Sequence, residues 1–278
     1  MKTIGTIILA LFLVCNIAIS QDTLYVYKTG TVVSKRAVID IDSVTFYKNY
    51  KTPNPETVTD IDGNVYHTVK IGTQTWMVEN LKTTKYRNGE SILNITDASS
   101  WGTGMTGKWS DYGNSSTYSI RFGHFYNGWA VKDSRNIAPS GWHVPTDAEW
   151  TTLENYLIAN GYNYDGTKTG DKFYKSLAAN TNWFTYSVIG TIGNDLSKNN
   201  STGFNALPGG YRDSNGNFSL QGSNGYFWSS TSFIPSIGTC LYARVLSYDG
   251  MLTFKTYLNY SSSSSNYDYG LSVRCIKD

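Results

Sequence analysis

The feature that most constrains this fold is one helix signal with a clear beginning and end. Much of the remaining sequence alternates apolar and polar residues, as β-strands do. Thr146 and Glu149 have the spacing of a capping box, in which each side chain bonds the other residue's backbone N–H. Asn160-Gly161 is a typical helix end. Between these limits one helical face is apolar, at Trp150, Leu153 and Leu157. The spacing predicts a helix over residues 146–160 that packs this face against an antiparallel sheet.

β-strand patterns lie on both sides of this helix. Residues 57–82 contain two turn signals, Asp62-Gly63-Asn64 and Gly72-Thr73-Gln74, between apolar runs. A shorter helix is expected over residues 172–179, and after Asn194 the chain returns to Gly-, Tyr- and Ser-rich strands. One helix pair between two β-rich halves predicts an α+β domain. Alternation in the C-terminal strands predicts core positions at Trp228, Ala243, Val245, Leu271 and Val273.

The N-terminal residues 1–20 have the parts of a secretory signal peptide. Lys2 is followed by an apolar run over residues 7–14 and by the small-residue site Ala18-Ile19-Ser20. A membrane anchor is the weaker interpretation, since the run is shorter than the ~20 residues that span a bilayer. Lipid modification of Cys15 is disfavoured because the residue before it is not Gly, Ala or Ser. We expect an exported protein, secreted or at the cell surface, with no membrane span in the mature chain.

Three segments are expected after this signal. Residues 21–50 alternate apolar and polar side chains around Thr29-Gly30, which predicts a small β unit. Residues 51–56 contain two prolines among polar residues and form the best candidate linker. Residues 57–278 are long enough to bury one sizeable core.

Composition excludes some classes of function. The chain has 15% aromatic and 16% charged residues, the reverse of a disordered protein. Its net charge of +2 lacks the basic excess of a nucleic-acid binder.

Metal and cofactor signals are weak. Asp60, Asp62 and Asn64 have calcium-loop spacing, but the twelfth position is Ile71, so a hairpin turn is favoured over a calcium site. No metal-ligand spacing occurs among the three histidines, His67, His124 and His143. We therefore expect no cofactor.

The candidate catalytic residues are no more distinctive than those that any chain of this length contains. Ser229 and Ser230 lack the G-x-S-x-G context of a hydrolase. Carboxylate pairs for glycoside hydrolysis can be drawn from Asp147, Glu149, Asp195 and Asp213 without any of them standing out. A Ser-His-Asp site built from distant residues stays open. A non-enzyme is the expectation.

Five motifs stand out along the chain: the stretch 57–82, GWHVPTDAEW (141–150), GFNALPGGYRDSNGNF (203–218), GYFWSST (225–231) and GLSVRCIKD (270–278). Together they resemble the Fibrobacter succinogenes major paralogous domain family, which occurs in exported proteins. The pattern is also distantly similar to formylglycine-generating enzymes, which implies a C-type-lectin-like fold with antiparallel sheets and one main helix. The C-x4-C copper pair of those enzymes does not carry over, and neither do the calcium-binding tripeptides of lectins.

Cys240 and Cys275 remain if Cys15 leaves with the signal peptide. In an oxidising compartment two cysteines suggest one disulfide. Antiparallel pairing of their strands would bring the sulfur atoms together, and two single buried thiols are the alternative. The family resemblance implies a different partner for Cys275 in many members, at the position that Ala138 occupies here.

A Tyr/Ser/Asn-rich stretch at 256–270 suggests the function. Tyr257, Tyr260, Tyr267 and Tyr269 are interpreted as an exposed contact surface, because tyrosine with Ser and Asn is the mixture of antibody loops. An ordinary surface loop is the alternative. The hypothesis is an exported, non-catalytic binding module for an extracellular glycan or protein. A structural cell-envelope protein, or a diverged enzyme of the formylglycine-generating or polysaccharide-hydrolase type, are the alternatives.

Overall fold

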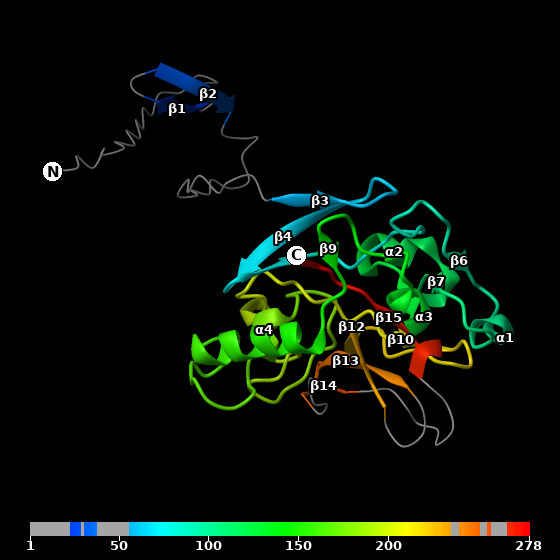
Figure 1. Ribbon diagram of the computed structural model, residues 1–278. Coiled ribbons are helices and arrows are strands. Elements are labelled where there is room, and N and C mark those ends of the chain that lie inside the picture. The colour runs from blue at the N-terminus through cyan, green and yellow to red at the C-terminus, as the bar shows by residue number, and fades with distance from the viewer. Residues whose placement is uncertain (1–22, 29–30, 38–55, 235–238, 251–254, 257–265) are drawn as a thin grey trace, which may run out of the picture. The chain divides into compact units, whose positions relative to one another are not determined.

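The computed structural model describes residues 23–28, 31–37, 56–234, 239–250, 255–256 and 266–278 (Figure 1). The chain divides into two compact units, residues 1–52 and 53–278. In the first unit, β1 (Thr23–Lys28) and β2 (Thr31–Ala37) pair antiparallel. The predicted signal peptide and all but the last residue of the predicted linker lie outside the described residues.

The second unit contains two sheets, and the described strands of the smaller one all pair antiparallel. In spatial order they are β3 (Thr57–Thr59), β4 (Val65–Ile71), β5 (Gln74–Met77), β16 (Ile276–Lys277) and β9 (Trp142–His143). The C-terminal strand β16 therefore lies between two strands from much earlier in the sequence. Between β3 and β4 the Asp60 carboxylate accepts hydrogen bonds from the backbone N–H groups of Asp62 and Asn64 at 3.0 and 2.9 Å. This is a hairpin turn, as predicted.

The larger sheet follows the order β14-β13-β12-β15-β8-β7-β6 across the described residues, with the β10–β11 pair joined to β15. Most neighbours are antiparallel, whereas β12 with β15 and β6 with β7 are parallel. The strands are β6 (Leu93–Asn94), β7 (Lys108–Ser110), β8 (Phe125–Asn127), β10 (Tyr211–Arg212), β11 (Phe218–Ser219), β12 (Asn224–Phe233), β13 (Cys240–Ser247), β14 (Lys255–Thr256) and β15 (Gly270–Ser272). With the helices, these sheets make an α+β domain, which confirms that prediction.

One helix, α4 (Asp147–Ala159), is much longer than the other described helices and is seen in green in Figure 1. Both hydrogen bonds of its capping box are present. The shorter predicted helix is reduced to α5 (Tyr174–Leu177). Three short helices were not predicted, α1 (Ala98–Trp101), α2 (Ser116–Phe122) and α3 (Gly128–Lys132). The described residues also form single turns of 3-10 helix at η2 (Tyr112–Asn114), η3 (Leu196–Lys198) and η4 (Asn266–Asp268).

Two groups of buried apolar side chains form the core. One includes the apolar face of α4, and in it the rings of Trp150 and Trp76 lie 4.7 Å apart. The other lies around β12, β13 and β15. The predicted core positions are all buried, which confirms them: Trp150, Leu153, Leu157, Trp228, Ala243, Val245, Leu271 and Val273.

The two cysteines are buried and are not joined by a disulfide. The predicted pairing of their strands is wrong, because β12 lies between β13 and β15 in the sheet. Cys240 instead pairs with Phe233 of β12, while Cys275 precedes β16 in the smaller sheet. Burial raises the pKa of the Cys275 thiol.

Candidate functional site

The tyrosines that the sequence placed on a contact surface are divided by the structure. Tyr267 and Tyr269 are only 7% and 9% exposed, so their predicted exposure is wrong. The ring of Tyr267 lies 4.7 Å from that of Trp129. Asn266, the residue before Tyr267, attaches this segment to β13, because its amide exchanges hydrogen bonds with the backbone of Leu241 at 2.8 and 2.7 Å. Tyr257 and Tyr260 lie outside the described residues.

Each of the three histidines is hydrogen-bonded to a carboxylate rather than to another histidine. His67 contacts Glu79 at 2.7 Å, and His124 contacts Asp111 at 2.6 Å. His143 lies between two carboxylates, at 2.8 Å from Glu149 and 2.6 Å from Asp278. Within the described part of the chain, no group of three or more His, Cys, Asp or Glu side chains is suited to hold a metal ion.

The four carboxylates that the sequence offered for glycoside hydrolysis each have a partner within the fold. Asp147 contacts Arg244 at 2.8 Å and Lys255 at 2.7 Å. Glu149 completes the capping box of α4. Asp195 and Asp213 accept hydrogen bonds within their own turns.

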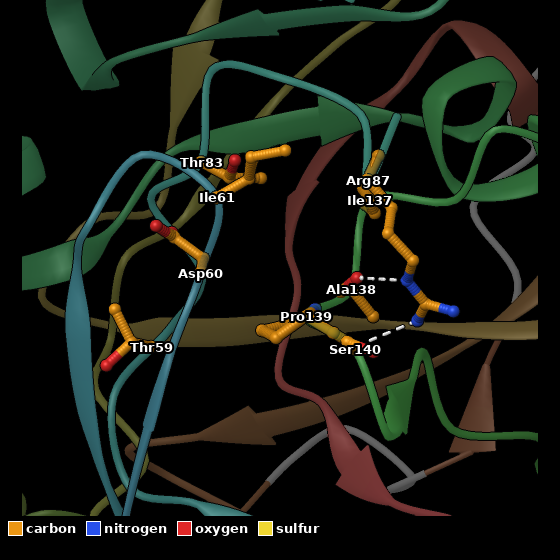
Figure 2. A pocket seen from close by; sticks show the side chains of 9 residues that line it. All are labelled: Thr59, Asp60, Ile61, Thr83, Arg87, Ile137, Ala138, Pro139 and Ser140. Atoms are coloured by element: carbon orange, nitrogen blue, oxygen red, sulfur yellow. Dashed lines mark hydrogen bonds between the residues drawn. The ribbon is translucent and has the colours of Figure 1, made fainter. Parts of the chain in front are cut away.

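A small recess of about 190 Å³ lies between the turn after β3 and the turn before β9 (Figure 2). Its lining residues are Thr59, Asp60, Ile61, Thr83, Arg87 and Ile137–Ser140. The Arg87 guanidinium is directed toward the second turn, where it donates to the carbonyl oxygens of Ala138 and Pro139 at 3.0 and 2.8 Å. The Asp60 carboxylate, on the opposite side, accepts the Tyr66 hydroxyl at 2.6 Å in addition to its turn bonds. The charged groups of this recess already stabilise the fold.

A second, larger hollow of about 480 Å³ lies against helix α2, and we call it the α2 pocket. It is formed by residues 117, 118, 120–122, 182, 184, 221 and 222. These residues come from α2, from the segment after α5 and from the turn before β12, so only folding brings them together.

Apolar side chains are unusually exposed around the α2 pocket. Phe184 is 56% exposed, Tyr118 36% and Ile120 80%. Single exposed apolar residues are ordinary, whereas several on one hollow indicate a contact surface. Ser119 and Phe122 are the buried residues of α2, and the ring of Tyr118, one turn before Phe122, stacks on the Phe122 ring at 6.2 Å between centroids. The other residues of the helix, Ile120 among them, are exposed to solvent.

The Tyr118 ring and the backbone at Phe184 both contact the rest of the domain. Tyr118 lies 5.4 Å from the ring of Tyr112, measured between centroids. The neighbour of Phe184, Trp183, is buried and donates its indole N–H to the Ala206 carbonyl at 3.2 Å. The backbone N–H of Phe184 itself bonds the Gly222 carbonyl at 2.8 Å.

Gly222 is required beside the Phe184 ring. Its φ is +83°, and a Cβ there would lie 2.6 Å from a ring carbon of Phe184. Glycine is the residue that accepts both this backbone conformation and this close approach.

The polar side of the α2 pocket carries one cation and no carboxylate among its lining residues. Arg121 donates to the Asn182 amide oxygen at 2.9 Å, and within the described residues it forms no ion pair. The amides of Asn182 and Gln221 and the Thr117 hydroxyl add neutral hydrogen-bonding groups.

The sequence model of the Fibrobacter succinogenes major domain matches residues 69–277. The chain belongs to this family. The matched region of this Fibrobacter succinogenes major domain includes α4, both core groups in large part and every residue of the α2 pocket. Neither a curated protein nor a solved structure matches the chain. None of the described helices has the length and apolar character needed to cross a membrane.

Proposed function

We propose that this chain is an exported, non-catalytic binding module that recognises an extracellular glycan or protein at the α2 pocket. One observation carries the proposal: two exposed aromatic rings line the same hollow as a guanidinium that forms no ion pair within the described residues. Aromatic residues and arginine are the side chains most enriched where proteins bind their partners. Export rests on the signal-peptide features of residues 1–20.

We also propose that residues 57–278 form a variant of the C-type-lectin-like fold. The motif resemblance supports it, and so does the combination of two mainly antiparallel sheets with one main helix. This is an argument from fold analogy, so it supports binding on loops in general and no particular ligand.

Tyr257 and Tyr260 stay in the proposal as a second contact surface. Their support is the Tyr/Ser/Asn composition of the segment. A double change of both residues to alanine separates their contribution from that of the α2 pocket.

A glycan array and a peptide library, screened with residues 21–278, test the function. The matched variants are Phe184→Ala in the α2 pocket and Met105→Ala, which removes another exposed apolar side chain outside it. We expect at least one ligand whose binding falls roughly tenfold or more in Phe184→Ala, the loss typical of an aromatic anchor, and is unchanged in Met105→Ala.

Three results would contradict the proposal. Ligand affinities that Phe184→Ala leaves unchanged would place the binding site elsewhere. The absence of any ligand would favour a structural envelope protein. Turnover of a bound glycan would make the chain an enzyme.

A further inference from the structure

The α2 pocket combines apolar faces with hydrogen-bonding edges at the same place. Phe184 and Tyr118 expose their rings, and Asn182 and Gln221 lie next to them with amide groups. A sugar ring has the matching character, since its C–H face is apolar and its edge carries hydroxyl groups. Such a ring gains apolar contact on the aromatic face and hydrogen bonds from the amides at once.

The volume of the α2 pocket fits a short oligosaccharide. At about 480 Å³ it lies within the range of roughly 300–1,000 Å³ that small-ligand sites occupy. The rings already pack against the protein, Phe184 close to Gly222 and Tyr118 on Tyr112. Side chains that are already packed lose less conformational entropy on binding, which favours a weakly interacting ligand such as a saccharide.

The charge of the α2 pocket narrows the ligand class further. Arg121 is the one charged side chain among the lining residues, and Asn182, its hydrogen-bond partner, is neutral. A guanidinium binds a carboxylate through two parallel N–H···O bonds, which are about twice as strong as neutral ones. A carboxylate is therefore the group that complements this surface.

A peptide bound as an added strand fits the observations less well. That mode of recognition uses unpaired backbone groups at a strand edge. The backbone N–H groups of Phe184 and Tyr186 are already donated to the carbonyls of Gly222 and Gly193, at 2.8 and 2.9 Å. The segment beside the pocket therefore offers side chains more than backbone.

We propose that the α2 pocket binds an oligosaccharide that carries a carboxylate, with a sugar ring on Phe184 and Tyr118 and the carboxylate on Arg121. This inference rests on the proposed function and names its ligand class. Uronic acids and sialic acids both supply the carboxylate, so the two sources are tested separately.

Calorimetric titration with defined probes tests the inference of a carboxylated saccharide. The acidic probes are trigalacturonate and sialyllactose, the neutral ones are galactotriose and lactose, and hexaglutamate is the acidic peptide. The variants are Phe184→Ala, Arg121→Gln and Lys70→Gln, which removes an exposed cation from β4 outside the pocket. Thermal unfolding of each variant shows whether it is folded.

We expect at least one acidic saccharide to bind more tightly than its neutral counterpart. Arg121→Gln should weaken it roughly tenfold, the loss expected for a charged hydrogen-bonded pair, and should remove the preference over the neutral sugar. Phe184→Ala should weaken acidic and neutral sugars alike, and Lys70→Gln should change neither.

Two outcomes would overturn the carboxylated-saccharide inference and leave the binding function standing. In one, only neutral sugars bind, and in the other only hexaglutamate binds, each with an affinity that Phe184→Ala weakens. Binding of an acidic sugar that Lys70→Gln weakens as much as Arg121→Gln would overturn the inference as well, because attraction would then be unspecific. Failure of all five probes overturns the inference, and the library screen with Phe184→Ala then decides the binding function by itself.

Discussion

Buried arginine and lysine side chains connect loops of the main domain to its sheets. Arg274 donates to the Asn80 amide oxygen at 2.8 Å and to the Phe204 carbonyl, and Lys108 donates to three carbonyls in the last residues of α1 and just after it. A buried cation needs several such acceptors because it has lost its water. Burial accordingly lowers the pKa of Arg274 to about 9 and that of Arg212 to about 10.

Replacing Arg274 tests the importance of these contacts. Arg274→Leu keeps an apolar stem but leaves the Asn80 and Phe204 oxygens without their donors. Since each buried acceptor left unsatisfied costs about 1–3 kcal/mol, we expect the free energy of unfolding to fall by about 3 kcal/mol or more. Urea denaturation measures it, and the exposed Arg121→Gln should change stability by less than about 0.5 kcal/mol. Equal losses in both variants would contradict this explanation.

His143 makes stability depend on pH. Burial lowers its pKa, but the hydrogen bonds and charges of Asp278 and Glu149 outweigh burial, so the folded-state pKa is raised above 6.5. Stabilisation by the protonated ring is therefore complete below about pH 6.5 and is lost as the pH rises through the folded-state pKa. The pKa of Glu149 is lowered despite its burial, mainly by hydrogen bonds from Thr146, so this carboxylate stays ionised in that window.

His143→Gln should thus cost more stability at pH 5.5 than at pH 9. Urea denaturation of the wild type and the variant at both pH values gives the difference. A difference in the free energy of unfolding between the two proteins that does not change with pH would show that the ring acts through packing alone.

At the scale of elements, α4 could be predicted because its signals are local. The capping box, the apolar face and the Asn160 end all lie within fifteen consecutive residues. Helix α2 has seven residues and no apolar stripe, so nothing in its sequence distinguishes it from a loop. The pairing of β15 with β12 joins residues far apart in the chain, and sequence alternation alone cannot choose a strand's neighbour.

The capping box provides a stability prediction with a control on the same helix. Thr146→Ala removes the acceptor of the Glu149 backbone N–H. We expect a loss of about 1 kcal/mol, typical of an N-cap residue. Thr152→Ala removes an exposed hydroxyl in the middle of α4 and should cost little, because alanine is a better helix former. Thermal unfolding that ranks the two variants in the opposite order would contradict the capping role.

The turn before β12 links stability to the shape of the α2 pocket. Gly222→Ala should lower stability by about 1–2 kcal/mol through its backbone conformation and should also displace the Phe184 ring. Gly63→Ala is the matched control, since Gly63 has a φ of +85° and nothing within 4 Å of an added Cβ. Both variants should unfold earlier, while only Gly222→Ala weakens ligand binding. If both variants bind the ligand equally well, Phe184 is not part of the binding site.

For the whole molecule, the sequence predicted the class of fold and the family but not the candidate site. The family motifs lie along one continuous stretch, as do the apolar patterns that gave the core. The α2 pocket takes residues from three separate segments, and the features that make it a candidate are exposed fractions and ring contacts. The exposure predicted for Tyr267 and Tyr269 was wrong because composition does not show that Asn266 is hydrogen-bonded to β13.

Backbone amide shifts during titration with trigalacturonate and sialyllactose test the site most directly, because they show where on the molecule a ligand lies. Binding at the α2 pocket predicts that the largest changes occur in residues 117–122, 182–184 and 221–222. The recess between Thr59 and Ser140 should show none, since its charged groups are already hydrogen-bonded. Saturable changes confined to that recess, or to residues far from α2, would contradict the assignment of the α2 pocket as the binding site.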